Sequence, residues 1–418
     1  MSTTVVVGSS IGGVRTAQAL RREGYEGRVV LVGEQAREPY DKPPLSKQFL
    51  AGDWEQERLV ILPRATAAAE GIELRLGVPA TGLDVAGRQV LLSDGSRLDY
   101  DHVVIATGAS ARPPRWRQGA GVHVLRTLDD GRALRADLER GGPVVVIGGG
   151  FIGAEVAATT RALGLEVTVV DPVLTPMGRM VGTEIGRYFR DLHQRNGVTT
   201  RFGVGVQGIS GAAGSLRVQL TDGALMDAAA VVVGIGAVPN DGWLTDSGLC
   251  LRDGVLCDEY SRAVDAPDVF AVGDVARWFH PDRGQYTRVE HWTNAVEQAA
   301  CVAHNIVHPG DRRPYRPVEY VWSDQYDWKI QMVGRPFRGT HHELVGELGD
   351  GRSRAVMFYS DDTGHLCGAV TINWPRALVQ CRRQLHAGAT FDDAVAAVER
   401  LLSASEPNVP VATTVGSS

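Results

Sequence analysis

Residues 144–163 read VVVIGGGFIGAEVAATTRAL, a run of apolar residues that leads through glycines into an alanine-rich segment. Gly148, Gly150 and Gly153 occupy all three positions of the pattern G-x-G-x-x-G. Asp171 closes the next valine-rich run, VTVVD, 18 residues after the last of these glycines. In a strand–turn–helix unit, such glycines let the backbone approach a pyrophosphate at the helix N-terminus, and the acidic residue accepts hydrogen bonds from a ribose. The stretch therefore predicts a dinucleotide-binding unit.

The same pattern occurs near the N-terminus, in VVVGSSIGGVRTAQALRR (residues 5–22). Gly8 and Gly13 hold its outer positions and Ser10 stands at the middle one, while Glu34 ends the following run, VVLVGE. A single glycine pattern is weak evidence, because glycine-rich turns also occur without a ligand. Two copies, each preceded by an apolar run and followed by a carboxylate, favour two bound nucleotides.

The remaining pattern of the chain indicates an α/β fold with more than one domain. A length of 418 residues exceeds one ordinary core, and short runs of consecutive apolar residues are typical of parallel strands buried on both faces. The expected strands are Val5 to Val7, Val29 to Val32, Val103 to Ala106, Val144 to Ile147, Val167 to Val170, Val231 to Val233 and Val269 to Val272. After about residue 314, aromatic and polar residues alternate, which predicts an antiparallel C-terminal domain. We expect the tail from about Ser403 to be disordered.

Composition narrows the class of protein. A hydrophobic content of 44%, with no apolar run of membrane-spanning length and no signal peptide at MSTTVVVG, predicts a soluble cytoplasmic protein. The net charge of −6 argues against nucleic acid as the main partner. The five cysteines form no C-x-x-C or other short metal-ligand spacing, so we expect five buried free thiols and no metal site.

Six further segments carry a resemblance to a known family. They are PYDKPPLSK (39–47), VIATGA (104–109), LRTLDD (125–130), VFAVGDVA (269–276), EHWTNAVEQA (290–299) and VWSDQYDWKIQ (321–331). In this order they resemble the ferredoxin reductases of bacterial oxygenase systems, of the putidaredoxin, rhodocoxin and biphenyl-dioxygenase reductase type. The resemblance runs from Thr4 to about Leu402, and apoptosis-inducing factor is a more distant likeness.

The resemblance implies two Rossmann-like domains of the glutathione-reductase type and a C-terminal α+β interface domain. Residues 1–112 and 236–312 would hold tightly but non-covalently bound FAD, residues 113–235 would hold NADH, residues 313–403 would form the interface domain, and residues 404–418 would be the tail. The implied activity is that of an NADH-dependent flavoprotein oxidoreductase. Hydride passes from NADH to FAD, and single electrons then pass to a transiently bound [2Fe–2S] ferredoxin that serves a cytochrome P450 or a Rieske-type oxygenase.

The resemblance also assigns residues to the two cofactors. The expected cofactor-binding residues are Gly8, Ser10, Ile11, Gly13, Glu34, Lys42, Lys47, Ala80, Thr107, Gly108, Arg126, Gly148, Gly150, Phe151, Ile152, Gly153, Glu155, Asp171, Gly236, Gly273, Asp274, Trp292 and Trp322. Two of them, Lys47 and Glu155, are the expected catalytic pair. A cation at Lys47, beside the flavin N5 edge, would stabilise the anionic reduced flavin. Glu155 also suits a helix first turn, where the dipole favours an acid. Lys42 replaces the arginine usual in the family, so a bidentate contact there is in doubt.

Several assignments leave a structural alternative open. Arg126 fits either an FAD contact or a structural ion pair, and Phe151 fits either a gate for the nicotinamide or simple packing of helix on strand. Trp322 would line the flavin or belong to a core, and Ala80 would touch the cofactor or only pack. At the level of function, an NADH oxidase, peroxidase or disulfide reductase would need a redox cysteine where PPLSK has none. An NADH-sensing flavoprotein similar to apoptosis-inducing factor is the other alternative.

Overall fold

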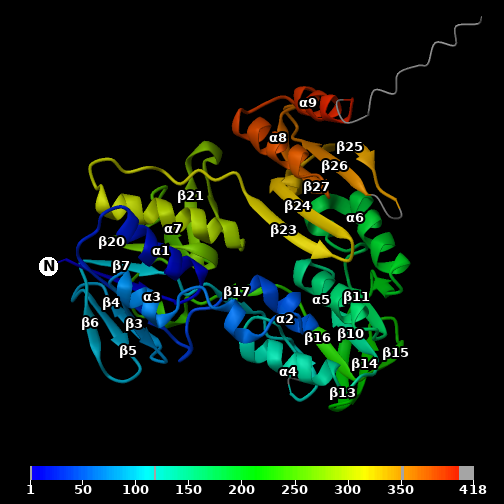
Figure 1. Cartoon of the computed structure of the whole chain (residues 1–418), viewed down its shortest axis with the longest axis horizontal. Coiled ribbons are helices and arrows are strands. Elements are labelled where there is room, and N and C mark those ends of the chain that lie inside the picture. Colours follow the sequence, from blue (N-terminus) through cyan, green and yellow to red (C-terminus); the bar gives the residue numbers. More distant parts are fainter. Residues whose placement is uncertain (1, 117–118, 350–352, 404–418) are drawn as a thin grey trace, which may run out of the picture. The chain divides into compact units, whose positions relative to one another are not determined.

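The computed structural model describes residues 2–116, 119–349 and 353–403, so the expected tail at 404–418 lies outside the described residues. The chain divides into two compact units, the first ending at Val321 and the second beginning at Trp322 (Figure 1). The second unit thus begins nine residues after residue 313, the start expected for the interface domain. Each unit is built around its own sheets.

The first unit contains a nine-stranded sheet. Its strands, in spatial order, are β22 (Gln285–Thr287), β21 (Ala276–His280), β18 (Val255–Cys257), β19 (Arg262–Ala263), β20 (Ala266–Ala271), β7 (His102–Ile105), β1 (Thr3–Val7), β2 (Arg28–Gly33) and β3 (Ile72–Leu76). The five strands from β20 to β3 are parallel. Helices α1 (Ile11–Arg22) and α7 (Trp292–Val307) cover one face, and the small sheet of β4 (Ala80–Asp84), β5 (Gln89–Leu92) and β6 (Arg97–Asp99) packs on the other. The five parallel strands are rich in valine because both of their faces are buried.

A second sheet in the same unit repeats this plan. Five parallel strands follow the order β12 (Thr199–Phe202), β11 (Val167–Asp171), β10 (Val144–Ile147), β16 (Ala230–Val233) and β9 (Val122–His123). Helices α4 (Leu128–Leu138), α5 (Phe151–Ala162) and α6 (Gly178–Arg195) contact its strands. The three-stranded sheet of β13 (Val206–Ala212), β14 (Ser215–Leu220) and β15 (Leu225–Ala228) shares a hydrophobic core with it. Short elements complete the unit: β8 (Ala109–Ala111) paired with β17 (Ala237–Pro239), and helices α2 (Gln48–Ala51) and α3 (Arg64–Ala69).

The second unit is an antiparallel sheet with two helices. Its order is β23 (Tyr320–Gln325), β24 (Trp328–Gly334), β27 (Leu366–Ile372), β26 (Arg354–Ser360) and β25 (His341–Glu347). Helix α8 (Pro375–His386) contacts β24 and β27, and α9 (Phe391–Ser403) contacts β25 and β26. The predicted fold class, two nucleotide-binding α/β folds followed by an antiparallel α+β part, is confirmed.

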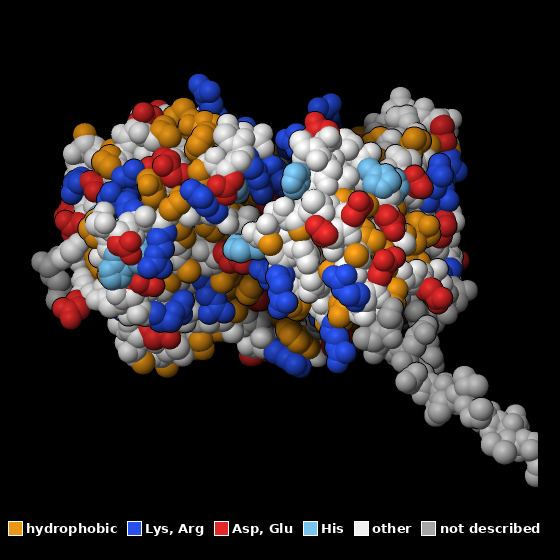
Figure 2. All heavy atoms as spheres, turned by 90° about the horizontal axis from the view of Figure 1, so that it is seen from above, with side chains coloured by type: hydrophobic (Ala, Val, Ile, Leu, Met, Phe, Trp, Pro, Cys, Tyr) orange, Lys and Arg blue, Asp and Glu red, His pale blue; other side chains and the backbone are white. Residues whose placement is uncertain are grey.

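The surface carries charges of both signs. Basic and acidic side chains are interspersed on the face seen in Figure 2, in keeping with a small net charge. Within the part of the chain that the structure describes, no helix is both long and apolar enough to cross a membrane.

All five cysteines are free, but only Cys257 and Cys381 are buried, so the expectation of five buried thiols is wrong for the other three.

Candidate active site

The first nucleotide turn depends on two glycines. Gly8 has φ +116°, and a Cβ placed on it would lie 2.2 Å from the carbonyl oxygen of Ala106. A Cβ on Gly13 would lie 1.8 Å from the carbonyl oxygen of Gly8. Glycine at both positions therefore lets α1 begin directly against the end of β1, with Ser10 as its N-cap. The Ser10 side chain makes no capping hydrogen bond, and Ile11 is the first helical residue.

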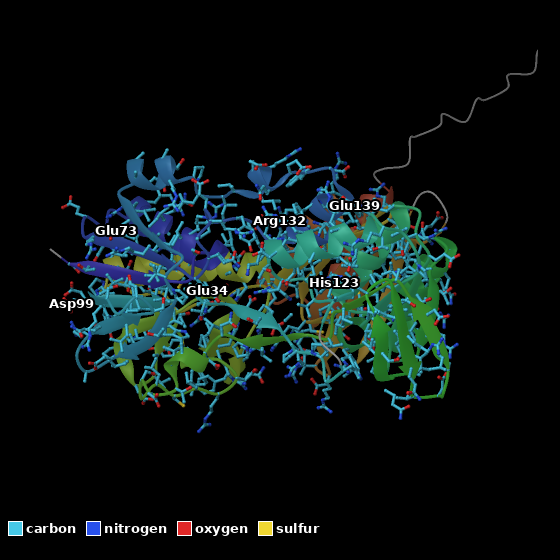
Figure 3. The ribbon with its side chains drawn as sticks, turned by 90° about the horizontal axis from the view of Figure 1, so that it is seen from below. Glu34, Glu73, Asp99, His123, Arg132 and Glu139 are labelled. Carbon is cyan, nitrogen blue, oxygen red and sulfur yellow. The ribbon has the colours of Figure 1, made fainter. Side chains whose placement is uncertain are left out.

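A cavity of about 420 Å³ lies at this turn, at the carboxyl ends of β1 and β2. Seven predicted residues line it, namely Gly8, Ser10, Glu34, Lys42, Ala80, Thr107 and Arg126. Glu34 follows β2 and is exposed (Figure 3). Other predicted residues of this region are not among the lining residues: Ile11, Gly13, Lys47, Gly108, Gly273, Asp274 and Trp292. The size and location of the cavity are typical of a ligand site at the edge of an α/β sheet.

Donors without a partner suit this cavity to an anionic, polar ligand. Among the described residues, Arg37 Nη1 and Trp243 Nε1 are buried in its wall without a hydrogen-bond partner. The pKa of the Lys42 amine is lowered to about 8, chiefly by burial and also by the nearby Arg126 guanidinium, against the opposing effect of Asp274. A phosphate-bearing ligand would relieve both conditions, because it supplies acceptors and negative charge. The wall therefore fits the pyrophosphate of a dinucleotide such as FAD.

Arg126 forms an ion pair, one of the two roles that the sequence left open, and it also lines the cavity. Its Nε donates to the carbonyl oxygen of Ala109 (2.7 Å), and its Nη2 forms an ion pair with Asp274 Oδ2 (2.8 Å), while its side chain lines the cavity. Asp274 lies in the turn after β20, where the Gly273 amide donates to Gln298 Oε1 (2.8 Å). Asp274 is thus not one of the lining residues, but its ion pair orients Arg126, which does line the cavity.

Two other predicted residues near this region are held by hydrogen bonds, Trp292 through its side chain and Gly108 through its backbone. Trp292, the first residue of α7, donates from Nε1 to Asp41 Oδ1 (2.8 Å). Burial raises the pKa of Asp41, although this bond and the Lys42 backbone amide act in the opposite direction. Gly108 has φ +69°, and its carbonyl oxygen accepts from the Asn240 amide (2.9 Å).

Lys47 and Glu155, which are far apart in sequence, form an ion pair. Lys47 Nζ lies 2.6 Å from Glu155 Oε2, and the two side chains are 12% and 3% exposed. Ser46 Oγ donates to the same carboxylate oxygen (2.5 Å) and Thr159 Oγ1 donates to the carbonyl oxygen of Ser46 (2.8 Å). Lys47 Nζ also donates to the carbonyl oxygen of Pro43 (3.1 Å). The loop of PYDKPPLSK is thereby fastened to helix α5 of the second nucleotide fold.

The second nucleotide turn has the same construction as the first. A Cβ on Gly148 would lie 2.2 Å from the carbonyl oxygen of Gly234, and one on Gly153 would lie 1.9 Å from that of Gly148. Nothing lies within 4 Å of a Cβ on Gly150, so the N-terminus of α5 is open at that point. Phe151 and Ile152, the first residues of α5, are both partly exposed there.

Asp171 ends β11 and is held by the backbone. Its Oδ2 accepts from the Gly149 amide (2.6 Å) and its Oδ1 accepts from the Val173 amide (2.8 Å). Each carboxylate oxygen has a second lone pair, so both can still accept a hydroxyl. Gly236, with φ +104°, lies where the chain leaves this fold, and its carbonyl oxygen accepts from the Arg112 amide (2.9 Å).

Trp322 belongs to the second unit, where it is half-buried in β23. Its proposed place beside the flavin stays a prediction.

Sequence reasoning missed part of the cavity wall. The residues concerned are Val7, Ser9, Val32, Gln35, Arg37, Glu38, Pro39, Tyr40, Pro79, Ala106, Ala109, Ser110, Thr127, Asn240, Gly242 and Trp243. Tyr40 lies inside a quoted motif and Arg37 lies just before it, so that signal was present. Asn240 exchanges hydrogen bonds with Thr107, donating from Nδ2 to its carbonyl oxygen (2.9 Å), and nothing local in the sequence indicates this partner.

Comparison with known proteins agrees with this geometry. A family model described as pyridine nucleotide-disulphide oxidoreductase matches residues 2–299, and one described as reductase C-terminal matches residues 320–401. The ferredoxin–NAD(+) reductase component of the anthranilate 1,2-dioxygenase system of Burkholderia cepacia is 36% identical over 390 residues, 93% of this chain and 95% of that one.

Two solved structures are similar over almost the whole chain. The ferredoxin reductase for the CYP199A2 system from Rhodopseudomonas palustris has a TM-score of 0.91 and 33% identity, covering 97% of this chain and 100% of that one. The covalent putidaredoxin reductase–putidaredoxin complex has a TM-score of 0.86 and 30% identity, covering 95% and 99%. The chain therefore belongs to the pyridine nucleotide-disulphide oxidoreductase family and, within it, to the ferredoxin reductases that its sequence motifs indicated.

Proposed function

We propose that this chain is an NADH-dependent ferredoxin reductase that uses FAD to pass single electrons to a [2Fe–2S] ferredoxin. The observation that carries the proposal is the Lys47–Glu155 ion pair, which joins the loop beside the first nucleotide fold to the opening helix of the second. Two nucleotide folds fastened at this point suit direct transfer between two bound cofactors. The B. cepacia relative is by name a ferredoxin–NAD(+) reductase, and one solved relative is a complex with putidaredoxin.

We assign FAD to residues 1–112 and 236–312, NADH to residues 113–235, and partner docking to residues 313–403. The cavity at Gly8 is the FAD site in this assignment, with Glu34 at the ribose and Arg37, Lys42 and Arg126 at the phosphates. The ferredoxin would serve a cytochrome P450 or a Rieske-type oxygenase in the cytoplasm, in keeping with the oxygenase systems named for the relatives.

The residues of the chain supply position and charge, whereas FAD, when bound, supplies a carrier that takes a hydride and gives up electrons one at a time. Lys47 holds a positive charge beside the nicotinamide site, and Glu155 and the carbonyl oxygen of Pro43 fix the direction of its amine. Arg126, oriented by Asp274, and Lys42 hold the phosphates. The open N-terminus of α5 at Gly150 admits the NADH pyrophosphate to backbone amides.

The thiols argue against the alternative of a disulfide reductase. Desolvation by burial raises the pKa of Cys301 and Cys367 to about 11 each and of Cys381 to about 12, so these thiols stay protonated near neutral pH. A thiolate is the form that attacks a disulfide. The stretch PPLSK, where such a reductase would need a redox cysteine, contains none.

The acceptor is tested by NADH-driven reduction of cytochrome c, with and without a [2Fe–2S] ferredoxin from the same genome. We expect the ferredoxin to raise the rate, and higher ionic strength to reduce that gain, because small transient redox interfaces depend on charge. Substitution of an exposed charge outside residues 313–403, as in Glu73→Gln (39% exposed), should leave the gain unchanged. No gain with any such ferredoxin, together with rapid reduction of hydrogen peroxide or a disulfide, would contradict the proposal.

The coenzyme is expected to be NADH rather than NADPH because of Asp171. Its carboxylate would face the 2′-phosphate of NADPH as a like charge, at a cost of about 1 to 4 kcal/mol, or roughly fivefold to several-hundredfold in kcat/KM. Asp171→Asn should reduce this preference, and Asp227→Asn, at an 81% exposed position of β15, should not. Steady-state kinetics with both coenzymes measure the ratio. Equal kcat/KM values for the unsubstituted protein would refute the assignment.

A further inference from the structure

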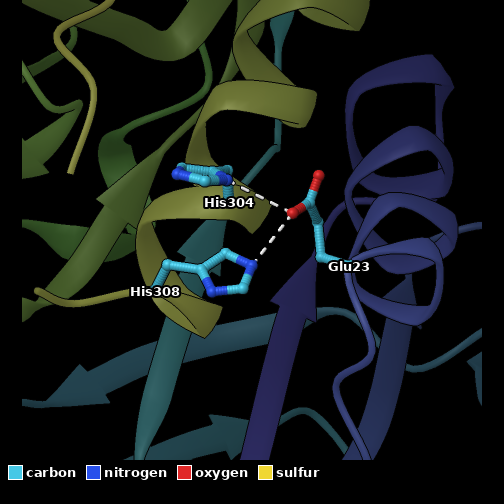
Figure 4. Close-up of side chains that lie close together, drawn as sticks. All are labelled: Glu23, His304 and His308. Carbon is cyan, nitrogen blue, oxygen red and sulfur yellow. Dashed lines mark hydrogen bonds and ion pairs between the residues drawn. The ribbon is translucent and has the colours of Figure 1, made fainter. Parts of the chain in front are cut away.

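Three potential metal ligands meet at the C-terminal ends of α1 and α7. Glu23 directly follows α1, His304 lies in the last turn of α7, and His308 directly follows α7 (Figure 4). Glu23 Oε2 lies 3.2 Å from His304 Nδ1 and 3.1 Å from His308 Nε2. The three ligand atoms all lie within 4.8 Å of one another.

Both ring nitrogens of His304 face hydrogen-bond acceptors. Its Nε2 faces the carbonyl oxygen of Asp311 (2.9 Å) and its Nδ1 faces the Glu23 carboxylate, and both partners only accept hydrogen bonds. A neutral imidazole has one N–H and satisfies one of them. If Nε2 donates to the carbonyl, the Nδ1 lone pair points at a carboxylate, which is repulsive unless a proton or a metal ion lies between them. An imidazole whose second nitrogen donates to a backbone carbonyl is typical of a metal ligand.

The ends of two helices add to the negative potential at this point. Helices α1 and α7 both finish here, so the negative ends of both dipoles face the cluster. The Asp311 carboxylate lies 3.5 Å from His304 Nε2 and brings a second acid. His304 is 8% exposed whereas His308 is 43% exposed, which leaves one side of the cluster open to solvent.

We propose that Glu23, His304 and His308 bind a divalent first-row transition cation of the zinc class. Two imidazoles and a carboxylate are a donor set that zinc takes, with water in the fourth position. In a tetrahedral zinc site with bonds of about 2.0–2.1 Å, neighbouring ligand atoms lie about 3.3 Å apart, close to the two separations seen here. The absence of a metal site was expected from the cysteine spacing, which does not bear on histidine and glutamate ligands.

The site is separate from the cofactor cavity. Ser10 at the start of α1 lines the cavity, and the 12 residues of α1 span about 18 Å at 1.5 Å per residue. The ion would clamp the ends of two helices that cover one face of the nine-stranded sheet. Its role is thus to stabilise the first unit, and hydride transfer does not pass through it.

The test uses the FAD-loaded full-length chain, free of any histidine tag, after EDTA treatment and removal of the chelator. We titrate ZnCl₂ by isothermal calorimetry in a buffer without phosphate, and record the thermal unfolding midpoint with and without zinc. We expect one equivalent of zinc to bind and to raise the midpoint, because the ion binds only the folded state. His308→Gln and Glu23→Gln should weaken this binding at least about tenfold and remove the shift.

His386→Gln is the matched control, since His386 is an exposed histidine in the last turn of α8. It should keep both the zinc equivalent and the midpoint shift. Retained flavin absorbance, and a metal-free midpoint close to that of the unsubstituted chain, show that a variant is folded. If zinc does not bind, or binds equally well to His308→Gln and Glu23→Gln, the proposal is overturned.

Discussion

Gly153→Ala should unfold the second nucleotide fold or destabilise it by more than about 3 kcal/mol, because the new Cβ would lie 1.9 Å from the carbonyl oxygen of Gly148. That oxygen belongs to the backbone of a tight turn, so it cannot give way as the end of a flexible side chain could. The free energy of unfolding, from denaturant titration of the FAD-loaded chain, measures the effect. Gly153 lies in the first turn of α5, so relief of this clash would also displace the backbone amides that open the helix.

Gly150→Ala is the matched control three residues earlier. Nothing lies within 4 Å of a Cβ there, and its φ of −79° suits alanine, so stability should change by no more than about 1 kcal/mol. The methyl group would instead obstruct the approach of a pyrophosphate, and the dissociation constant for NADH should rise at least about tenfold, or 1.4 kcal/mol. Equal stability of the two variants, or unaltered NADH binding by Gly150→Ala, would contradict this account of the turn.

Lys47→Met is expected to cost about 3–5 kcal/mol of stability, because it leaves the Glu155 carboxylate buried without its cation. Glu155 is only 3% exposed. Of the two donors to its Oε2 described above, Lys47 Nζ and Ser46 Oγ, the variant keeps only Ser46 Oγ. The rate of flavin reduction by NADH, measured by stopped-flow absorbance, should fall as well, since the positive charge is lost. The double variant Lys47→Met with Glu155→Gln should recover much of the stability without recovering the rate.

An exposed ion pair provides the comparison. Arg28 and Glu73 are 45% and 39% exposed and lie 2.7 Å apart, so Arg28→Met should cost no more than about 1 kcal/mol. If Lys47→Met costs no more than Arg28→Met, the Lys47–Glu155 pair is not a buried contact of the kind described. If the double variant regains the reduction rate, Lys47 acts through structure and not through its charge.

The sequence by itself determined the features that depend on neighbours along the chain. Each apolar run was identified correctly as a strand, because a parallel strand buried on both faces must be apolar at consecutive positions. The two turns were identified from their glycine patterns. These glycines are required because a backbone oxygen lies within about 2 Å of where a Cβ would stand, and only glycine lacks a Cβ. The C-terminal alternation of polar and apolar residues predicted antiparallel strands in the same local way.

Only the tertiary structure decided which side chains meet across long separations. Lys47 and Glu155 are 108 positions apart, Thr107 and Asn240 are 133 apart, and Glu23 and His304 are 281 apart. Whether such groups pair, and how deeply, depends on which loops and helix ends the packed sheets bring together. The Arg126–Asp274 pair and the lowered pKa of Lys42 have the same origin, because burial and the placement of distant charges arise only when the chain has folded.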